Sequence, residues 1–212
     1  MKKFILALTL TLASSICALA QSDDDQKKPE FFAGYSYGQA DARYGNFSVY
    51  EDHTSLSGFN AAAVFPVSRY VGIKGDVSGT YQSKNITLPT LSLSGIPIGS
   101  LAFTAKNSLY NVLGGVQVKD YASTKRFKPF AHALAGAAFR KNELTPGGTC
   151  ITTIICPGSR NDKGLAMAFG GGLDVRVNKR VDIRAFQLDY NPARFNGKFE
   201  SNFRFSIGVV FR

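Results

Sequence analysis

The sequence predicts an all-β fold, namely an eight-stranded antiparallel up-and-down transmembrane β-barrel. In the last ten residues, FRFSIGVVFR, the side chains of Phe203, Phe205, Ile207, Val209 and Phe211 alternate with mostly polar or small ones. This period of two is typical of a strand with one apolar face and one polar face. Several earlier segments repeat the pattern, their connections alternate between long and short, and a secretory signal precedes them. Together these observations favour a barrel whose apolar face meets lipid.

The N-terminal segment, MKKFILALTLTLASSICALA, has the three parts of a secretory signal peptide. Lys2 and Lys3 form a basic region, an apolar stretch follows, and small residues precede a predicted cut after Ala20. We expect Cys17 to leave with this segment, because the bulky residue before it argues against lipoprotein cleavage. Residues 21–30 are then expected to be a flexible periplasmic leader, and residues 31–212 the barrel domain.

The first four strands are indicated by large apolar side chains at every second position. In the clearest of them, Val71, Ile73 and Val77 alternate with Lys74 and Asp76. The four strands are expected at residues 31–38, 55–67, 70–83 and 107–119. They are joined by a polar loop at 39–54, a tight turn at 66–69 and a long loop at 84–106.

The last four strands are less regular and are expected at residues 127–141, 165–177, 181–190 and 203–212. The first of them is rich in alanine, which leaves its phase open. In the segment 181–190 the apolar parity changes between Ile183 and Phe186, so we expect a β-bulge near Arg184. Short turns at 120–126 and 178–180 alternate with longer loops at 142–164 and 191–198. An even strand number with this alternation is typical of a bacterial outer-membrane barrel with both termini in the periplasm.

Two other classes fit the sequence less well. A soluble lipocalin-like barrel also has eight strands, but its apolar face points inward and its connections do not alternate in this way. The formal net charge of +10 suggests nucleic acid as a partner. However, the basic residues are scattered singly along strands and turns, and an exported protein rarely meets nucleic acid. The charge favours outer-membrane lipid, anionic lipopolysaccharide in particular, as a partner, or else a solvated surface.

The chain resembles the small eight-stranded barrels of the OmpA/OmpX-like superfamily of outer-membrane proteins. The resemblance rests on FFAGYSYG, RYVGIKGDVSGTY, AMAFGGGLDVRV and the final FSIGVVFR, and covers nearly the whole mature chain. It implies a location in the cell outer membrane and recognition by the barrel-assembly machinery through the last strand. Ser206, Gly208, Val209 and Phe211 match the assembly signal of the family, whereas Arg212 follows the aromatic residue that usually ends it.

Polar residues on the lumen-facing side of the strands are expected to form a plug. An eight-stranded interior is only about wide enough for side chains, and buried charges must be paired. The expected lumen residues are Lys74, Asp76, Asn111, Gln117, Asp174, Arg176 and Arg204, which His132 and Asp189 can join. The alternative to a structural plug is a porin-like channel for ions or small solutes.

The sequence offers no convincing enzyme site, and we expect no catalytic residue, metal or cofactor. His53 in EDHTS lies beside acidic and serine residues, which makes an outer-membrane lipid hydrolase the enzymatic alternative. The similarity to lipid A deacylases stops at topology, because their His-x-Ser pattern is absent. Replacing His53 with alanine would separate a hydrolase from a binding protein.

The loop tips carry the strongest indications of function, because function concentrates in loops on rigid scaffolds. Cys150 and Cys156, in GGTCITTIICPGS, are expected to form a disulfide in an exported chain. The loop around residues 88–103 is unusually apolar, which suggests either a binding tip or two halves that extend the adjacent strands. Its apolar residues are Leu88, Leu91, Leu93, Ile96, Ile98, Leu101 and Phe103. The favoured function is a non-enzymatic barrel that supports the envelope, binds an extracellular partner through its loops, or both.

Overall fold

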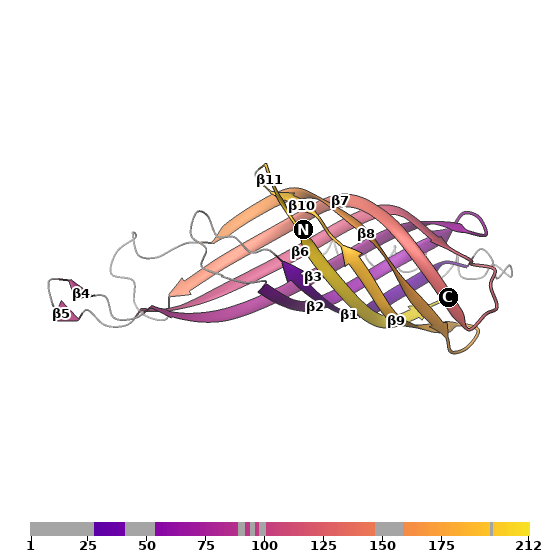
Figure 1. Ribbon diagram of the computed structural model, residues 1–212, viewed down its shortest axis with the longest axis horizontal. Coiled ribbons are helices and arrows are strands. Elements are labelled where there is room, and N and C mark those ends of the chain that lie inside the picture. The colour runs from indigo at the N-terminus through magenta and orange to yellow at the C-terminus, as the bar shows by residue number, and fades with distance from the viewer. Residues whose placement is uncertain are drawn as a thin grey trace, which may run out of the picture.

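Eight long antiparallel strands form a closed barrel in the computed structural model (Figure 1). The structure describes residues 28–40, 54–88, 92–93, 96–97, 101–146, 159–195 and 197–212. The long strands are β1 (Glu30–Ala40), β2 (Thr54–Pro66), β3 (Val71–Leu88), β6 (Leu101–Lys119), β7 (Phe127–Pro146), β8 (Arg160–Arg176), β9 (Val181–Tyr190) and β12 (Asn202–Phe211). Each pairs with its neighbour along the chain, and β12 closes the barrel on β1. The predicted fold class is therefore confirmed.

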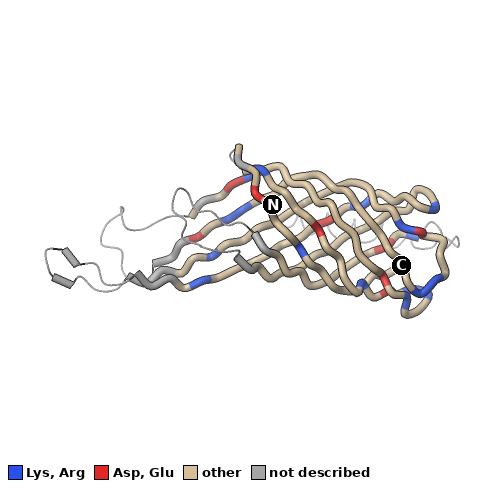
Figure 2. Tube along the Cα trace, viewed as in Figure 1, with Lys and Arg blue, Asp and Glu red and all other residues tan. Residues whose placement is uncertain are grey.

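The two ends of the barrel differ in the length of their connections. One end, called here the short-turn end, holds the turns 67–70, 120–126 and 177–180 together with Glu30 and Arg212. The other, the long-loop end, holds the connections 41–53, 89–100 and 147–159 and the segment between β9 and β12. Basic residues of the turns, among them Arg126 and Arg180, gather at the short-turn end (Figure 2).

Several strands are longer than the sequence pattern predicts. The expected loop 84–106 was too long, because β3 continues to Leu88 and β6 begins at Leu101, and these two residues pair with each other. Residues 84–88 and 101–106 of that segment therefore extend the strands, in agreement with the second interpretation for this part of the segment. Within the connection, β4 (Ser92–Leu93) and β5 (Ile96–Pro97) form a two-stranded pair.

The same correction applies to two of the other connections at this end. The expected loop 142–164 is shorter, because β7 reaches Pro146 and β8 starts at Arg160. The expected loop 191–198 contains the paired strands β10 (Ala193–Phe195) and β11 (Lys198–Glu200). Backbone pairing continues beyond the expected strand ends in each of these segments.

The β-bulge predicted near Arg184 is confirmed. Asp174 pairs with Arg184, but the next pair joins Leu173 to Phe186, so Ala185 is the extra residue on β9. The register with β12 shifts at the same point, between Ser206 and Gly208. Because of the bulge, the polar residues on both sides of Ala185 face the interior, although their parity in the sequence differs.

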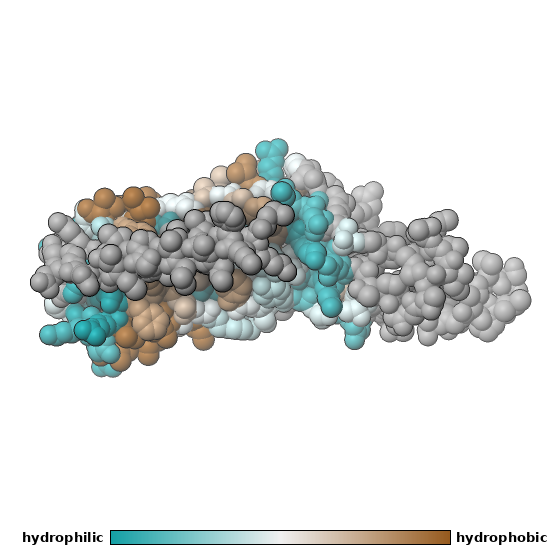
Figure 3. All heavy atoms as spheres, turned by 180° about the vertical axis from the view of Figure 1, so that it is seen from behind, coloured by the Kyte–Doolittle hydropathy of each residue, from teal (hydrophilic) through white to brown (hydrophobic). Residues whose placement is uncertain are grey.

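The outer wall of the barrel is apolar. Large hydrophobic side chains at every second position of the long strands are exposed, as Ile73, Val112, Leu188 and Phe205 illustrate. Figure 3 shows these side chains as a brown zone between hydrophilic, teal regions on either side. An apolar belt around a closed strand barrel has the surface that a lipid bilayer requires.

Within the described residues, the structure contains no helix that is both long and apolar enough to span a membrane.

Candidate functional site

The interior of the barrel is filled with polar and charged side chains. Those of β9 lie on both sides of the bulge, where Asp182, Arg184, Gln187 and Asp189 are all at most 2% exposed. Such groups are tolerated away from water only when they are paired or hydrogen-bonded. The contacts of the interior therefore show how the structure compensates for burying them.

The central ion-pair cluster joins Asp189, Arg204 and Asp76. Arg204 Nη2 donates to Asp189 Oδ2 at 2.6 Å, and Arg204 Nη1 donates to Asp76 Oδ1 at 2.9 Å. Asn60 Nδ2 donates to both carboxylate oxygens of Asp76 at 3.1 Å. Gln187 Nε2 donates to Asp189 Oδ2 at 2.7 Å. Strands β2, β3, β9 and β12 are thereby joined across the lumen.

His132 connects this cluster to Lys74. Its Nε2 lies 3.0 Å from Asp189 Oδ1, and its Nδ1 lies 3.3 Å from Lys74 Nζ. Because an ammonium group can only donate, Nδ1 must accept, and the proton of a neutral His132 then sits on Nε2 facing Asp189. The ring of Phe130 stacks on the imidazole at 6.0 Å. His132 thus has a charged group next to each ring nitrogen and an aromatic ring on one face.

A second cluster, nearer the short-turn end, is centred on Lys119 and Asp174. Lys119 Nζ lies 2.8 Å from Glu30 Oε2 and 2.6 Å from Asp174 Oδ2. Arg184 Nε donates to Asp174 Oδ1 at 2.8 Å. The Arg184 guanidinium also lies 4.3 Å from the ring centroid of Phe32 and 4.2 Å from that of Phe130, where cation–π attraction stabilises it.

Toward the long-loop end, the interior changes from charged to apolar. The buried cluster there is made of Leu109, Leu113, Leu134, Ala138, Ala166, Ala168, Ala193 and Phe195. Arg140 lies beside it, with its guanidinium 4.3 Å from the Phe195 ring centroid and a bidentate pair with Glu200. The described interior therefore has a charged segment and an apolar segment in series along the barrel.

Most of the lumen residues expected from the sequence are buried inside the barrel. Lys74, Asp76, Asn111, Gln117, Asp174 and Arg204 are all at most 4% exposed. Asn111 donates to Ser78 Oγ at 3.3 Å, and Gln117 donates to the Tyr121 hydroxyl at 3.3 Å.

Arg176 differs from this expectation. It is half-buried, and its Nε donates to the backbone carbonyl of Asn178 at 3.4 Å. It is the last residue of β8, so its side chain reaches the rim and the adjacent turn. Arg184, rather than Arg176, is the arginine that pairs with Asp174.

Sequence reasoning missed several polar and charged residues of the interior. Asp182, Arg184 and Gln187 could have been found by continuing the polar parity of β9 through the predicted bulge. Lys119 and Lys128 stand next to a turn, where alternation does not tell inward from outward. Glu30 is expected in the leader, but it is the first residue of β1 and is buried.

The predicted assembly signal lies at the seam between β1 and β12. Ser206 is buried with its Oγ 3.5 Å from that of Ser36, Gly208 pairs with Gly34, and Phe211 is exposed on the outer wall. Arg212, which departs from the family pattern, donates from Nε to Glu30 Oε1 at 2.8 Å and also pairs with Asp182. The additional arginine thus contributes ion pairs to the short-turn end.

The remaining predicted residues belong to the long connections. Cys150, Cys156, His53, Leu91 and Ile98 lie outside the described residues. The other residues of the predicted binding loop are strand residues in their backbone, in β3, β4, β5 and β6: Leu88, Leu93, Ile96, Leu101 and Phe103. In the part of the chain that the structure describes, no cluster of three or more His, Cys, Asp or Glu residues could hold a metal ion.

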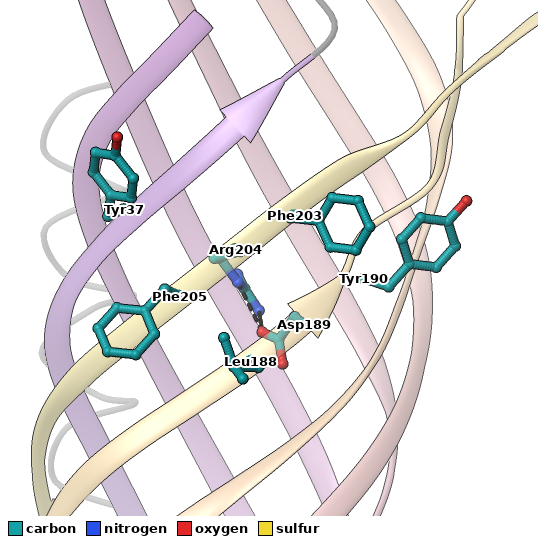
Figure 4. Close-up of a pocket in the computed structure, with 7 residues that line it drawn as sticks. All are labelled: Tyr37, Leu188, Asp189, Tyr190, Phe203, Arg204 and Phe205. Carbon is teal, nitrogen blue, oxygen red and sulfur yellow. Dashed lines mark hydrogen bonds and ion pairs between the residues drawn. The ribbon is translucent and has the colours of Figure 1, made fainter. Parts of the chain in front are cut away.

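A hollow of about 400 Å³ opens beside β1, β9 and β12. Its rim is formed by outward side chains, and the strand positions of Asp189 and Arg204 lie between them (Figure 4). The rim residues are Tyr37, Leu188, Tyr190, Phe203 and Phe205. The hollow is therefore an apolar depression that adjoins the central ion pair.

A closed barrel with an apolar outside and paired charges inside defines a transmembrane barrel of the bacterial outer-membrane type. The family model described as "Outer membrane protein beta-barrel domain" matches residues 6–212, and the chain belongs to this family. The family indicates a location in the bacterial outer membrane. No curated protein sequence matches the chain.

Solved structures with the same fold are distant in sequence. One of them is Ail, the attachment invasion locus protein of Yersinia pestis, solved in complex with the heparin analogue sucrose octasulfate. Ail is 16% identical to this chain with a TM-score of 0.53, and the match covers 86% of this chain and 97% of Ail. Neisserial surface protein A is 11% identical with a TM-score of 0.50; the match covers 86% of this chain and 96% of that chain. At these identities, the likeness shows the shared barrel fold.

The filled interior gives a prediction for conduction. Planar-bilayer recordings of the purified barrel are expected to show rare, small openings or none, because ions would have to cross paired charges and then the apolar segment. Stable, large conductance in most insertions would contradict a closed interior. A matched recording of Leu113→Ser and Leu134→Ser, which make the apolar segment polar, is expected to raise the frequency of openings.

Proposed function

We propose that the chain is a non-enzymatic outer-membrane barrel whose long-loop end faces outward and binds an extracellular partner, while its wall contributes to the envelope. The observation that carries this proposal is the unequal length of the strands. β3, β6, β7 and β8 have 18, 19, 20 and 17 residues. About 9–11 residues are enough to cross a membrane, so these neighbouring strands project well beyond it.

The projecting strands make a stiff support for the loop tips. β3 and β6 remain paired without interruption from Val71 and Val118 to Leu88 and Leu101. β6 pairs with β7 up to Phe103 and Pro146. A continuous ladder fixes the two ends of this connection, Leu88 and Leu101, relative to the barrel, which lowers the entropic cost of binding at that end. The heparin analogue bound by Ail makes sulfated polysaccharide a suitable first probe.

Deletion of Leu91–Gly99 tests this function. The deletion leaves three residues between Leu88 and Leu101, which is enough for a β-hairpin connection. Cells displaying the shortened barrel are expected to lose most of their protein-dependent adhesion to octyl-coated surfaces, because the deleted residues are uncharged and largely apolar, and heparin-coated surfaces serve to test a polyanionic partner. The barrel itself should still show the gel shift between unheated and boiled samples.

The control is a change at the opposite end, Lys179→Gln with Arg180→Gln, which alters charge without touching the long-loop end. Adhesion should not change in this control. Unchanged adhesion of the deletion variant to octyl-coated surfaces would contradict binding through this connection.

The two cysteines of the mature chain are expected to form a disulfide in the connection 147–159. Cys150 and Cys156 are close in sequence, and the proposed location exposes them to an oxidising compartment. Mass spectrometry of a non-reduced digest should find the linked peptide, and its mass should increase by two hydrogens after reduction. Free thiols at both positions in protein purified from outer membranes would exclude the disulfide.

A further inference from the structure

The hollow beside β9 and β12 has the shape and lining for a hydrocarbon chain. The Tyr190 and Phe203 rings lie 5.2 Å apart and tilted, directly across the β9–β12 pair. Leu188 and Phe205 form the next outward pair along these strands, and Tyr37 stands beside Phe205 on β1. Figure 4 shows the rings of Tyr37, Phe203 and Phe205 around the strand positions of Asp189 and Arg204. The hollow is continuous with the lipid-facing wall.

Polar groups begin immediately beyond the hollow, toward the long-loop end. The Tyr190 hydroxyl lies 3.1 Å from Ser201 Oγ. Four residues beyond Tyr190, Arg194 is exposed and pairs in register with Phe199, whose ring centroid is 5.3 Å from the guanidinium. Four strand residues correspond to about 13 Å. An aromatic hollow is therefore followed by a hydroxyl pair and then by a cation.

A second cation stands next to Arg194 on the same outer face. Arg194 pairs with Leu165 of β8, and Lys163 is the next outward residue on that strand. Diagonal neighbours of this kind are roughly 7–8 Å apart. Two exposed cations at this spacing match two phosphate groups of one lipid headgroup, because arginine and lysine both bind phosphate well.

We propose that this part of the wall is a binding site for a phosphorylated lipid with several acyl chains. One acyl chain occupies the hollow, and the phosphate groups bind Arg194 and Lys163. The order of groups along the strand is the order found in a lipid: hydrocarbon, polar linkage, phosphate. The chemistry is that of the glycolipid of an outer leaflet, so the proposal rests on the orientation given under the proposed function.

The absence of tryptophan from the sequence provides a direct test. Phe203→Trp places a single emitter in the lining of the hollow. Tyr110→Trp places one on the outer face of β6, on another part of the wall. The purified, folded variants are titrated in detergent micelles with a phosphorylated, hexa-acylated glycolipid whose acyl chains carry bromine, which quenches tryptophan on contact. Quenching of the Phe203→Trp variant is expected at about tenfold lower lipid concentration than quenching of the Tyr110→Trp variant.

A charge change separates the site from general lipid contact. Adding Arg194→Gln to the Phe203→Trp variant is expected to shift its quenching curve to about that of Tyr110→Trp, since a charge-assisted hydrogen bond accounts for about tenfold in affinity. Adding Arg180→Gln, at the short-turn end, should leave the curve unchanged. Coinciding curves for the two tryptophan positions, or an equal effect of both arginine changes, would overturn the proposal.

Two further arms identify the lipid and separate this site from loop binding. Brominated phosphatidylglycerol, which has two acyl chains and one phosphate, is expected to quench Phe203→Trp more weakly; equal quenching would overturn the assignment to a multiply phosphorylated lipid. Deletion of Leu91–Gly99 in the Phe203→Trp background should leave quenching unchanged. The adhesion assay therefore tests binding through the loops, and the quenching assay tests the lipid site, independently of each other.

Discussion

Replacing Asp189 with alanine is expected to lower the free energy of unfolding by about 3–5 kcal/mol, the range for removing one partner of a buried ion pair. Asp189 accepts hydrogen bonds from Arg204 at 2.6 Å and from Gln187 at 2.7 Å, and it lies 3.0 Å from His132. The alanine variant leaves these groups buried without the carboxylate that compensates them. Urea unfolding in detergent micelles, followed by the gel shift of the folded barrel, measures the effect.

Asp120→Ala is the matched control, because it removes an aspartate side chain from an ion pair that is exposed rather than buried. Asp120 lies 3.3 Å from Arg69, and its hydrogen bond and charge raise the pKa of that guanidinium. Exposed pairs contribute little to stability, so the urea midpoint should stay unchanged. If the alanine variant of Asp189 does not fold, Asp189→Asn, which keeps the shape, is measured instead. Equal midpoints for the interior and surface variants would refute a stabilising role of the interior pairs.

Adding a methyl group to the seam between β1 and β12 is expected to have the second largest effect. Gly34 and Gly208 pair with each other across the closing strands. A Cβ atom on Gly34 would overlap the backbone oxygen of Ile207 and lie 2.6 Å from the Phe32 ring, and one on Gly208 would lie 2.5 Å from Gly34 Cα. Backbone atoms of two paired strands must then move, which costs about 3 kcal/mol at the upper end of overpacking. Gly34→Ala should therefore refold with a much lower yield of heat-modifiable barrel.

A second pair of glycines, elsewhere in the barrel, provides the control. Gly75 and Gly114 also pair directly, between β3 and β6, but a Cβ atom on either has no atom within 4 Å. Gly75→Ala and Gly114→Ala are expected to fold as well as the unmodified chain. Equal folding yields for Gly34→Ala and Gly75→Ala would show that the seam tolerates additional volume.

The alternation of side chains was sufficient to predict the strands and most inward positions. Lys74, Asp76 and Arg204 alternate in the sequence with apolar residues. This alternation alone was enough to predict that they face the lumen. The bulge near Arg184 was predictable for the same reason, because the apolar parity changes on either side of it. An alternation with a period of two indicates on which face of a strand each side chain lies, and this assignment holds in the folded chain.

The partners of the interior charges could not be predicted, because they depend on the stagger of strands around the barrel. Asp174 pairs with Arg184, across the bulge and from the neighbouring strand, rather than with Arg176 on its own strand. Arg204 reaches Asp76, which is 128 residues away in the sequence. Strand ends were also unpredictable, since Lys119 and Glu30 stand where alternation stops and the position of the turn decides their direction.

The ion pair between Glu30 and Arg212 has a consequence for the order of folding. The two residues are 182 positions apart, so their contact closes almost the whole described chain into one ring. Contacts of such high sequence separation form slowly, because the loss of chain entropy precedes any gain from the contact. Hairpins such as β3–β6 and β6–β7 can form first from residues close in sequence, and closure of β1 on β12 should be the rate-limiting step. Kinetic measurements on Arg212→Ala are therefore expected to show slower closure with unchanged early hairpin formation.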